Sequence, residues 1–333
     1  MKSFKPHFLK LLSFLLLVSV LSACEQPEQP GAYKNEAIKA SKREEFHKLN
    51  DQLLNLLKDN KVDDAENLMS KELLEDNTVK RTMELITNRT KQGSYRVLDE
   101  YYLVAKTDEP GSLVINTDAT GADAYTLKYN QSSTKENYVA FLVVPKDAAN
   151  KWLITAIYGK YNYGWKLNKF DIAQYAINGK NAPELYKLAK AKYAKGFWVD
   201  AANDMTLAVR CFHPSGQWQY NHENEMNQFY YKTLQQASAK TNFPITISQV
   251  PTKPKIFRIL TQDIPEGTFP MLYYVSSINI KDTVALKKEN AAIKKVIGKV
   301  IPGVDQDKKY VLYAAFNSIP NKKNNAPEYD FKS

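Results

Sequence analysis

From Asn35 onward, apolar residues recur at steps of three and four positions among charged ones, as they do along one side of an α-helix. The first set is Phe46, Leu49, Leu53, Leu56 and Leu57. Two more sets follow a break at Asp59-Asn60, and they are Ala65, Leu68, Met69 and Leu73, then Val79, Met83 and Ile86. The spacing therefore predicts three helices before Gly93.

After Gly93 the apolar period changes to that of β-strands. Strands are predicted at Tyr95 to Ala105, Tyr125 to Tyr129, Tyr138 to Val144, Trp152 to Tyr158 and Trp165 to Ile172. The last three are joined by short polar connections, which predicts an antiparallel meander. Within the final strand the alternation slips by one residue, and this indicates a bulge and a curved sheet.

Helices followed by a curved antiparallel sheet, over residues 35–178, resemble the nuclear transport factor two-like fold. The local features behind the resemblance are Gly93–Tyr95 at the start of the first strand and Trp165–Leu167 in the last one. The resemblance implies a cone whose sheet wraps around helices. It implies no activity, because that superfamily contains enzymes, ligand binders and structural additions to lipoproteins.

An enzyme with this fold is expected to place ionisable side chains inside the cone. The region has one histidine, His47, in a polar helical stretch, while Asp99 and Glu100 are neighbours in a strand and must point to opposite faces. We interpret all three as surface or rim residues. The chain also lacks G-x-S-x-G, G-x-x-x-x-G-K-[ST] and C-x-x-C, the motifs of serine hydrolases, P-loop proteins and thioredoxins.

Helical spacing returns in residues 179–242. Six residues there stand close to the spacing of one tetratricopeptide unit, and they are Ala189, Gly196, Trp198, Ala201, Ala208 and Pro214. No second copy follows at that period, and a further helix over Glu223 to Ala239 is predicted to cover the apolar face of the hairpin. Two interpretations stay open, a spacer between two sheet domains and a peptide-binding groove.

Residues 243–333 are predicted to form a second α+β unit. Their apolar spacing predicts a helix over Thr283 to Val300 and strands at Ile256 to Thr261, Leu272 to Ile280 and Tyr310 to Phe316. The whole chain is therefore predicted to be an α+β protein. It has helices and a cone-like antiparallel sheet, a central helical hairpin and this smaller C-terminal unit.

The composition is that of a globular protein with an uneven charge. The 333 residues include 12 Gly, 15 Pro and 2 Cys, which excludes collagen-like, low-complexity and disulfide-framework classes, and the net charge is +10. Residues 240–333 carry +7 of this, and five lysines share one side of the predicted helix, namely Lys287, Lys288, Lys294, Lys295 and Lys299. That side is either a solvated face or a surface for anionic headgroups, lipopolysaccharide or an acidic partner. No nucleic-acid partner is expected, because Arg258 is the only arginine there.

The first 23 residues have the order of an export signal. Three lysines precede an apolar run from Leu11 to Leu21, which is shorter than the roughly 18 residues needed to span a bilayer. The run ends in Leu21-Ser22-Ala23-Cys24, which resembles the lipobox of bacterial lipoproteins. The resemblance implies that residues 1–23 are removed as a signal peptide and that Cys24 receives fatty acids such as palmitate, which anchor the protein in an envelope membrane.

Residues 24–34 are polar and rich in proline, and they are predicted to form an extended tether. By analogy with lipoprotein sorting, a residue other than Asp after the cysteine favours the outer membrane. Whether the protein then faces the periplasm or the cell surface stays open, as does its oligomeric state.

No metal or cofactor is predicted. If Cys24 is acylated, Cys211 is the only thiol left, so no intramolecular disulfide is expected. The one dense group of potential metal ligands is Cys211, His213, His222, Glu223 and Glu225. Its spacing matches no zinc pattern, and a buried structural cysteine explains Cys211 better.

Aromatic residues cluster at one predicted hairpin and form the candidate ligand-binding site. These residues are Tyr158, Tyr161, Tyr163 and Trp165. Rings with an apolar face and a polar tip suit sugars and peptides. The alternative is that the rings pair across the strands and only stabilise the sheet.

These observations together predict a non-enzymatic, lipid-anchored protein of the bacterial cell envelope that binds a partner protein or a glycan. A hydrolase with an unrecognised site in the cone-like domain is one alternative. A structural assembly factor with a stoichiometric partner is another. A pocket with two or more converging titratable side chains would favour the enzyme, and an aromatic pocket would favour the binder.

Overall fold

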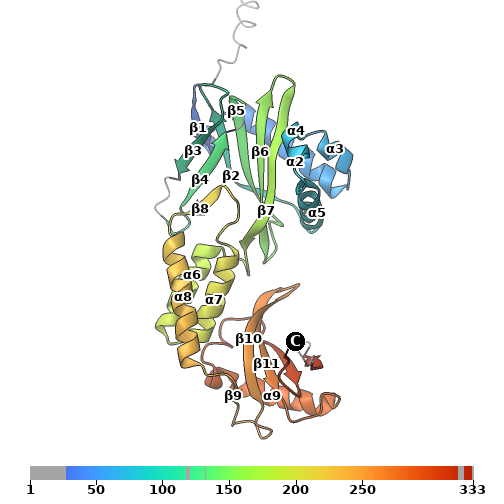
Figure 1. Cartoon of the computed structure of the whole chain (residues 1–333), viewed down its shortest axis with the longest axis vertical. Helices are drawn as coiled ribbons and strands as arrows, with labels where there is room; N and C mark the ends of the chain where they lie inside the picture. The colour runs from blue at the N-terminus through green and yellow to red at the C-terminus, as the bar shows by residue number, and fades with distance from the viewer. Residues whose placement is uncertain (1–27, 118–120, 132, 322–325, 332–333) are drawn as a thin grey trace, which may run out of the picture.

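The computed structural model describes residues 28–117, 121–131, 133–321 and 326–331. The predicted signal peptide and the lipobox cysteine, Cys24, lie outside these ranges. The chain is elongated, with one sheet and its helices at one end, three helices in the middle, and a second sheet with a long helix at the other end (Figure 1). The predicted α+β fold class is confirmed.

The first sheet is antiparallel, with the strand order β1-β2-β5-β6-β7. Its strands are β1 (Gly31–Lys34), β2 (Arg96–Val104), β5 (Glu136–Val144), β6 (Lys151–Tyr161) and β7 (Gly164–Ala176). The meander β5-β6-β7 confirms the predicted hairpins, and the predicted bulge is Asn168, which the pairing of Leu167 and Lys169 with consecutive residues of β6 leaves out. Strand β1 was expected to be part of the tether, but it pairs with β2.

Four helices cover one face of this sheet (Figure 1). They are α2 (Ala40–Lys58), α3 (Val62–Glu66), α4 (Lys71–Leu74) and α5 (Val79–Thr90). The stretch predicted as a single second helix is divided, because Ser70 donates its backbone N–H to the Leu167 carbonyl at 2.9 Å and accepts the Leu73 N–H on its hydroxyl. The apolar residues that predicted the helices, such as Phe46, Leu53 and Ile86, are buried against the sheet.

The opposite face of the first sheet is covered by a smaller sheet and by the helices of the middle segment. Its strands are β3 (Gly111–Asn116), β4 (Tyr125–Gln131) and β8 (Trp218–Tyr220), in that order. Strand β8 belongs to the segment predicted as helical, and its Trp218 ring stacks on Tyr125. The first sheet is therefore covered on both faces, and β8, which pairs with β4, ties the middle segment to the smaller sheet.

The middle segment contains α6 (Ala182–Ala194), α7 (Trp198–Arg210) and α8 (Glu223–Lys240). Helix α6 begins with a capping box, in which Asn181 and Glu184 each accept the other's backbone N–H. Helices α6 and α7 form the predicted hairpin, and α8 packs against them, as predicted for the helix over Glu223 to Ala239.

The C-terminal sheet has the order β13-β12-β11-β10-β9. The elements are β9 (Ile245–Thr246), β10 (Lys255–Ile264), β11 (Gly267–Val275), α9 (Thr283–Val300), β12 (Leu312–Phe316) and β13 (Glu328–Asp330). Helix α9 has the predicted bounds and covers one face through Leu286, Ile293 and Ile297. The strand predicted over Leu272 to Ile280 is misplaced, because a turn closed by Gly267, at φ +144°, starts it earlier.

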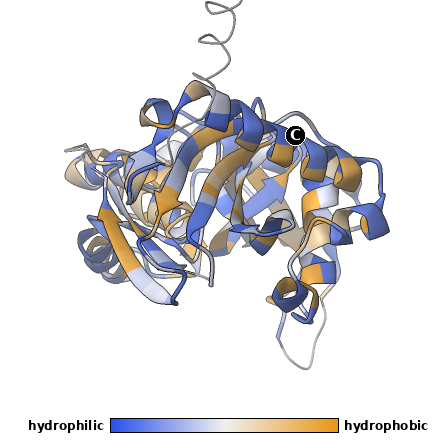
Figure 2. Cartoon of the chain, turned by 90° about the horizontal axis from the view of Figure 1, so that it is seen from above, coloured by the Kyte–Doolittle hydropathy of each residue, from blue (hydrophilic) through white to orange (hydrophobic). Residues whose placement is uncertain are grey.

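Hydrophobic and hydrophilic residues alternate along the strands and helices, as expected where each element buries one side (Figure 2). Within the described ranges, no helix is both long and apolar enough to cross a membrane.

Candidate functional site

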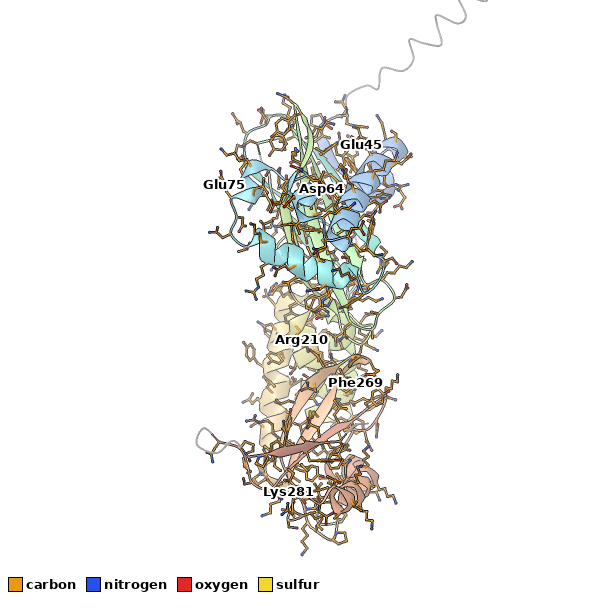
Figure 3. All side chains as sticks on the ribbon, turned by 90° about the vertical axis from the view of Figure 1, so that its right-hand side faces the viewer. Glu45, Asp64, Glu75, Arg210, Phe269 and Lys281 are labelled. Atoms are coloured by element: carbon orange, nitrogen blue, oxygen red, sulfur yellow. The ribbon has the colours of Figure 1, made fainter. Side chains whose placement is uncertain are left out.

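A pocket of about 300 Å³ lies where the three parts of the chain meet. Its walls come from the turn after β7, from α6 and α7, from the β10–β11 hairpin, and from the loop after α9. We call it the junction pocket. Phe269, in β11, lines the pocket and is labelled in Figure 3. Arg210, at the end of α7, is labelled nearby in the same figure. Pockets between packed units are common places for ligands.

A buried ion network forms the inner wall of the junction pocket. The ammonium group of Lys192 in α6 lies 2.9 Å from an Asp200 carboxylate oxygen and 2.6 Å from an Asp204 carboxylate oxygen, both in α7. The ammonium group of Lys308, in the loop after α9, lies 2.7 Å from the other Asp200 oxygen. Asp200 is completely buried, at 0% exposure. The two lysines therefore neutralise the two carboxylates, as buried charges require.

Burial sets the ionisation of this network. It raises the pKa of Asp204 to about 6, with Asp200 adding to the rise and Lys192 opposing it. Burial disfavours the charged form of Lys192, but Asp204 and Asp200 outweigh it and raise the pKa of that ammonium group. Burial also lowers the pKa of Lys308, although Asp200 opposes this shift. Asp204 is therefore the group of the network that takes up a proton under mildly acidic conditions.

Close backbone approaches hold the walls of the pocket together. Asn178, in the turn after β7, donates its side-chain amide to the Thr268 carbonyl at 2.6 Å and accepts the Thr268 N–H at 2.8 Å. A Cβ atom on Gly267 would lie 2.4 Å from the Asn178 side-chain oxygen, and one on Gly303 would lie 2.6 Å from the Phe197 ring. A larger residue at either position would therefore push the packed units apart. It would also be strained, because both glycines have positive φ values.

The mouth of the junction pocket carries exposed charges of both signs. They come from Lys180, Lys309, Glu266 and Asp307. The remaining lining consists of amides, hydroxyl groups, leucines, Ala149, Pro270 and the Phe269 ring. None of the lining residues is His, Cys or Ser, so the pocket holds no nucleophile–base pair of those types. This chemistry suits the binding of a polar ligand.

The predicted aromatic site is only partly at the surface. Tyr158 is 2% exposed and lies in the core under α2, while Trp165 packs edge-on against Phe46 and donates its indole N–H to Glu45 at 2.8 Å. Tyr161 and Tyr163 do stack on each other, with ring centroids 5.3 Å apart. Tyr163 is 70% exposed. The structure thus leaves the ligand-binding prediction to Tyr161 and Tyr163, since the other two rings stabilise the sheet.

The assignment of Glu100 to the surface or rim is wrong. Glu100 is 3% exposed, and both its carboxylate oxygens lie 3.1 Å from the imidazole Nε2 of His47. Tyr138 donates its hydroxyl to Glu100 at 2.9 Å, and Asn50 donates to Tyr138 at 2.8 Å. Burial and the neighbouring Glu100 hold the pKa of Tyr138 well above its ordinary value, so this hydroxyl remains a donor.

The Cys211 region does not form a metal centre in the described part of the chain, where no three His, Cys, Asp or Glu side chains are placed to hold an ion. Cys211 is buried in the core between the first sheet and α6–α8, and burial raises the pKa of its thiol to about 12. The imidazole Nδ1 of His213 lies 3.8 Å from a Glu223 carboxylate oxygen, and that of His222 lies 3.4 Å from a Glu225 carboxylate oxygen.

The five lysines of α9 are exposed. They occupy the side of the helix opposite its buried residues. The ammonium nitrogen of Lys294 also lies 5.7 Å from the centroid of the Tyr313 ring. Helix α9 and strand β1, the first described strand, lie toward opposite ends of the long axis (Figure 1).

The junction network was missed by the sequence analysis. Asp200 and Asp204 are four positions apart, on the same side of α7 as the buried Ala201 and Ala208, and charged residues on an apolar side are a detectable signal. Lys308 gives no such signal, because it lies in a polar loop about 100 positions away. Only the tertiary structure brings it to Asp200.

Comparison of this chain with protein-family models, with curated proteins and with solved structures gives no match. The resemblances to bacterial lipoproteins, to the nuclear transport factor two-like fold and to a tetratricopeptide hairpin therefore remain predictions from the sequence.

Proposed function

We propose that this protein is a non-enzymatic, lipid-anchored protein of the bacterial cell envelope that binds a glycan in the junction pocket. The observation that carries the proposal is the pocket itself, about 300 Å³ in volume and enclosed by three separate parts of the chain. A volume near the lower end of the range for ligand sites fits one or two sugar rings.

The chemistry of the pocket supports a hydroxyl-rich ligand. Its buried carboxylates are paired with lysines, so they are poor candidates for a free general base. Amides, hydroxyl groups and charges of both signs offer many hydrogen bonds to sugar hydroxyls, and the Phe269 ring contributes an apolar surface. Titratable side chains do converge here, as an enzyme would require, but they neutralise one another.

The proposed anchor is at Cys24, seven positions before strand β1, which lies at the end of the molecule that holds the first sheet. A membrane anchored at this end would be far from α9 (Figure 1). The exposed lysines of α9 would then face a soluble anionic partner or solvent. Cell fractionation of a Cys24→Ser variant tests the anchor. The variant is expected in the soluble fraction, and full recovery with the membranes would refute acylation as the means of attachment.

A thermal-shift screen tests the glycan proposal. Full-length protein in mild detergent is mixed with a panel of neutral, amino and uronic-acid mono- and disaccharides. A sugar that binds the folded state raises the unfolding temperature by mass action. The rise is expected to vanish in Lys309→Glu, at the mouth of the pocket, and to persist in Lys187→Glu, an exposed change on α6 outside it. No shift with any sugar would count against the proposal.

The alternative of an enzyme in the cone-like domain is favoured by the His47–Glu100 pair. A partly exposed imidazole held by a buried carboxylate is the arrangement of an oriented general base. Hydrolysis of nitrophenyl esters and glycosides tests it. If the unmodified protein hydrolyses a substrate and His47→Gln does not, this alternative is established. If the unmodified protein shows no hydrolysis, the binding function is supported.

A further inference from the structure

A second hollow, distinct from the junction pocket, lies between α7, the C-terminal half of α8 and β10. Its volume is about 460 Å³, and none of its lining residues is charged. We call it the neutral groove. Asn203 and Thr261 line both hollows, so the contact between α7 and β10 separates them. Charged residues line the junction pocket, so the two hollows differ in the chemistry of their walls.

Two helices form one wall of the neutral groove, each with the spacing of a single helix face. The positions follow i, i+3, i+4 and i+7 in both helices, and they are Val199, Ala202, Asn203 and Thr206 in α7 with Leu234, Ala237, Ser238 and Thr241 in α8 and just beyond it. Leu234 is 38% exposed, and Phe243, which follows α8, is 41% exposed. The helices therefore present small and apolar side chains to an open space.

The other wall is the edge of β10. Ile259, Leu260 and Thr261 are consecutive, yet all three line the neutral groove. Because consecutive side chains of a strand point to opposite faces, the groove must run along the edge of the strand and not over one face. Strand β9 pairs only with Lys255 and Ile256, and among the described strands none continues beside β10 from Arg258 to Thr261.

We propose that the neutral groove binds a short, uncharged segment of a partner protein, which pairs as an additional strand with β10 between Arg258 and Thr261. An unpaired strand edge offers alternating donors and acceptors, which an extended backbone satisfies. The lack of charge in the lining matches a neutral segment, because a charged side chain would lose its water with no partner in return. The open edge has room for about four residues at roughly 3.3 Å per residue.

A peptide selection tests the site. Random seven-residue peptides are displayed on phage and selected against the full-length protein in mild detergent. Selection is expected to enrich neutral sequences with apolar residues at alternate positions. Ala237→Lys places a charge in the groove and is expected to weaken binding of the selected peptide by tenfold or more. Ala239→Lys makes the same change on the exposed opposite side of α8 and should leave binding unchanged.

The conformation of the bound segment is tested by N-methylation of the selected peptide, one residue at a time. Strand pairing predicts that methylation at alternate residues abolishes binding, whereas methylation at the residues between them is tolerated. Enrichment of charged peptides, equal binding by Ala237→Lys and unmodified protein, or a methylation profile without this alternation would overturn the proposal. Failure to enrich any peptide would do so as well.

The neutral groove and the junction pocket can fail independently. Ala237 lines only the groove, and Lys309 lines only the pocket. Ala237→Lys is therefore expected to keep the sugar-dependent thermal shift, and Lys309→Glu is expected to keep peptide binding.

Discussion

Two clusters of buried charge in the described part of the chain differ in what the charge connects. The cone cluster lies under α2 and consists of His47, Asn50, Glu100 and Tyr138. The junction cluster lies beside the junction pocket and consists of Lys192, Asp200, Asp204 and Lys308. The first joins one helix to the sheet on which it packs. The second joins the helical hairpin to the loop after α9.

The two clusters also differ in the kind of partner that surrounds the buried carboxylates. In the cone cluster, hydrogen-bond donors of one packed unit surround a single carboxylate. In the junction cluster, full charges meet across the boundary between two units, although apolar residues would pack there at lower desolvation cost. We attribute the charges at this boundary, beside a pocket, to the proposed ligand site.

The largest effect is expected from removing the central cation of the junction cluster. Lys192→Met leaves Asp204 buried without its partner, so the free energy of unfolding should fall by about 3–5 kcal/mol. Chemical denaturation measures the change. Lys187→Met, on the exposed side of the same helix, is the control and should change stability by less than about 0.5 kcal/mol. Equal losses in the two variants would mean that the network adds nothing to the free energy of unfolding beyond an exposed lysine.

A smaller loss is expected from the cone cluster. Glu100→Ala removes the acceptor of the Tyr138 hydroxyl and should lower the free energy of unfolding by about 1–3 kcal/mol. Glu100→Gln keeps an acceptor oxygen and should recover part of that loss. If Glu100→Gln proves as damaging as Glu100→Ala, the negative charge beside His47, and not the hydrogen bond, stabilises the cluster.

The stability that the junction cluster provides should also depend on pH. The pKa of Asp204 is raised from 3.8 to about 6, so between these values the folded protein holds a proton that the unfolded chain has released. Stability from this group is therefore lost as the pH rises through that range, by about 2 kcal/mol between pH 4 and pH 7. Asp204→Asn should remove this part of the pH dependence. An unchanged profile in that variant would assign the titration to another group.

The smallest effect is expected at the exposed edge of the same junction. Arg210 donates two hydrogen bonds to the Asp263 carboxylate, at 3.0 and 2.9 Å, and this pairing lowers the pKa of Asp263. Asp263 is more than half exposed, so Arg210→Met should cost only about 0.2–1 kcal/mol, and less at high salt. A loss as large as that of Lys192→Met would show that the exposed pair holds the units together.

The elements with a long, regular apolar period were predicted well from the sequence. Helix α9 matches its predicted bounds, and the slipped alternation near Trp165 correctly indicated the bulge at Asn168. Periodicity reports which side of an element is buried, and this information is local.

The contacts that build the sites were not predictable in the same way. Strand β8 is three residues long and pairs with β4 about 90 positions earlier, and β12 pairs with β11 in parallel across α9. Glu100 is buried because α2 supplies His47 and Asn50 above it. Such partners are remote in sequence, so no motif captures either cluster as a whole, and only Asp200 and Asp204 leave a local signal.

The most direct test of the central claim is a calorimetric titration of the sugar that gives the largest thermal shift. The account predicts saturable binding by the full-length protein and by Lys187→Glu, with at least a tenfold weaker affinity in Lys309→Glu. Equal affinity in all three proteins would place the sugar outside the junction pocket and contradict the account.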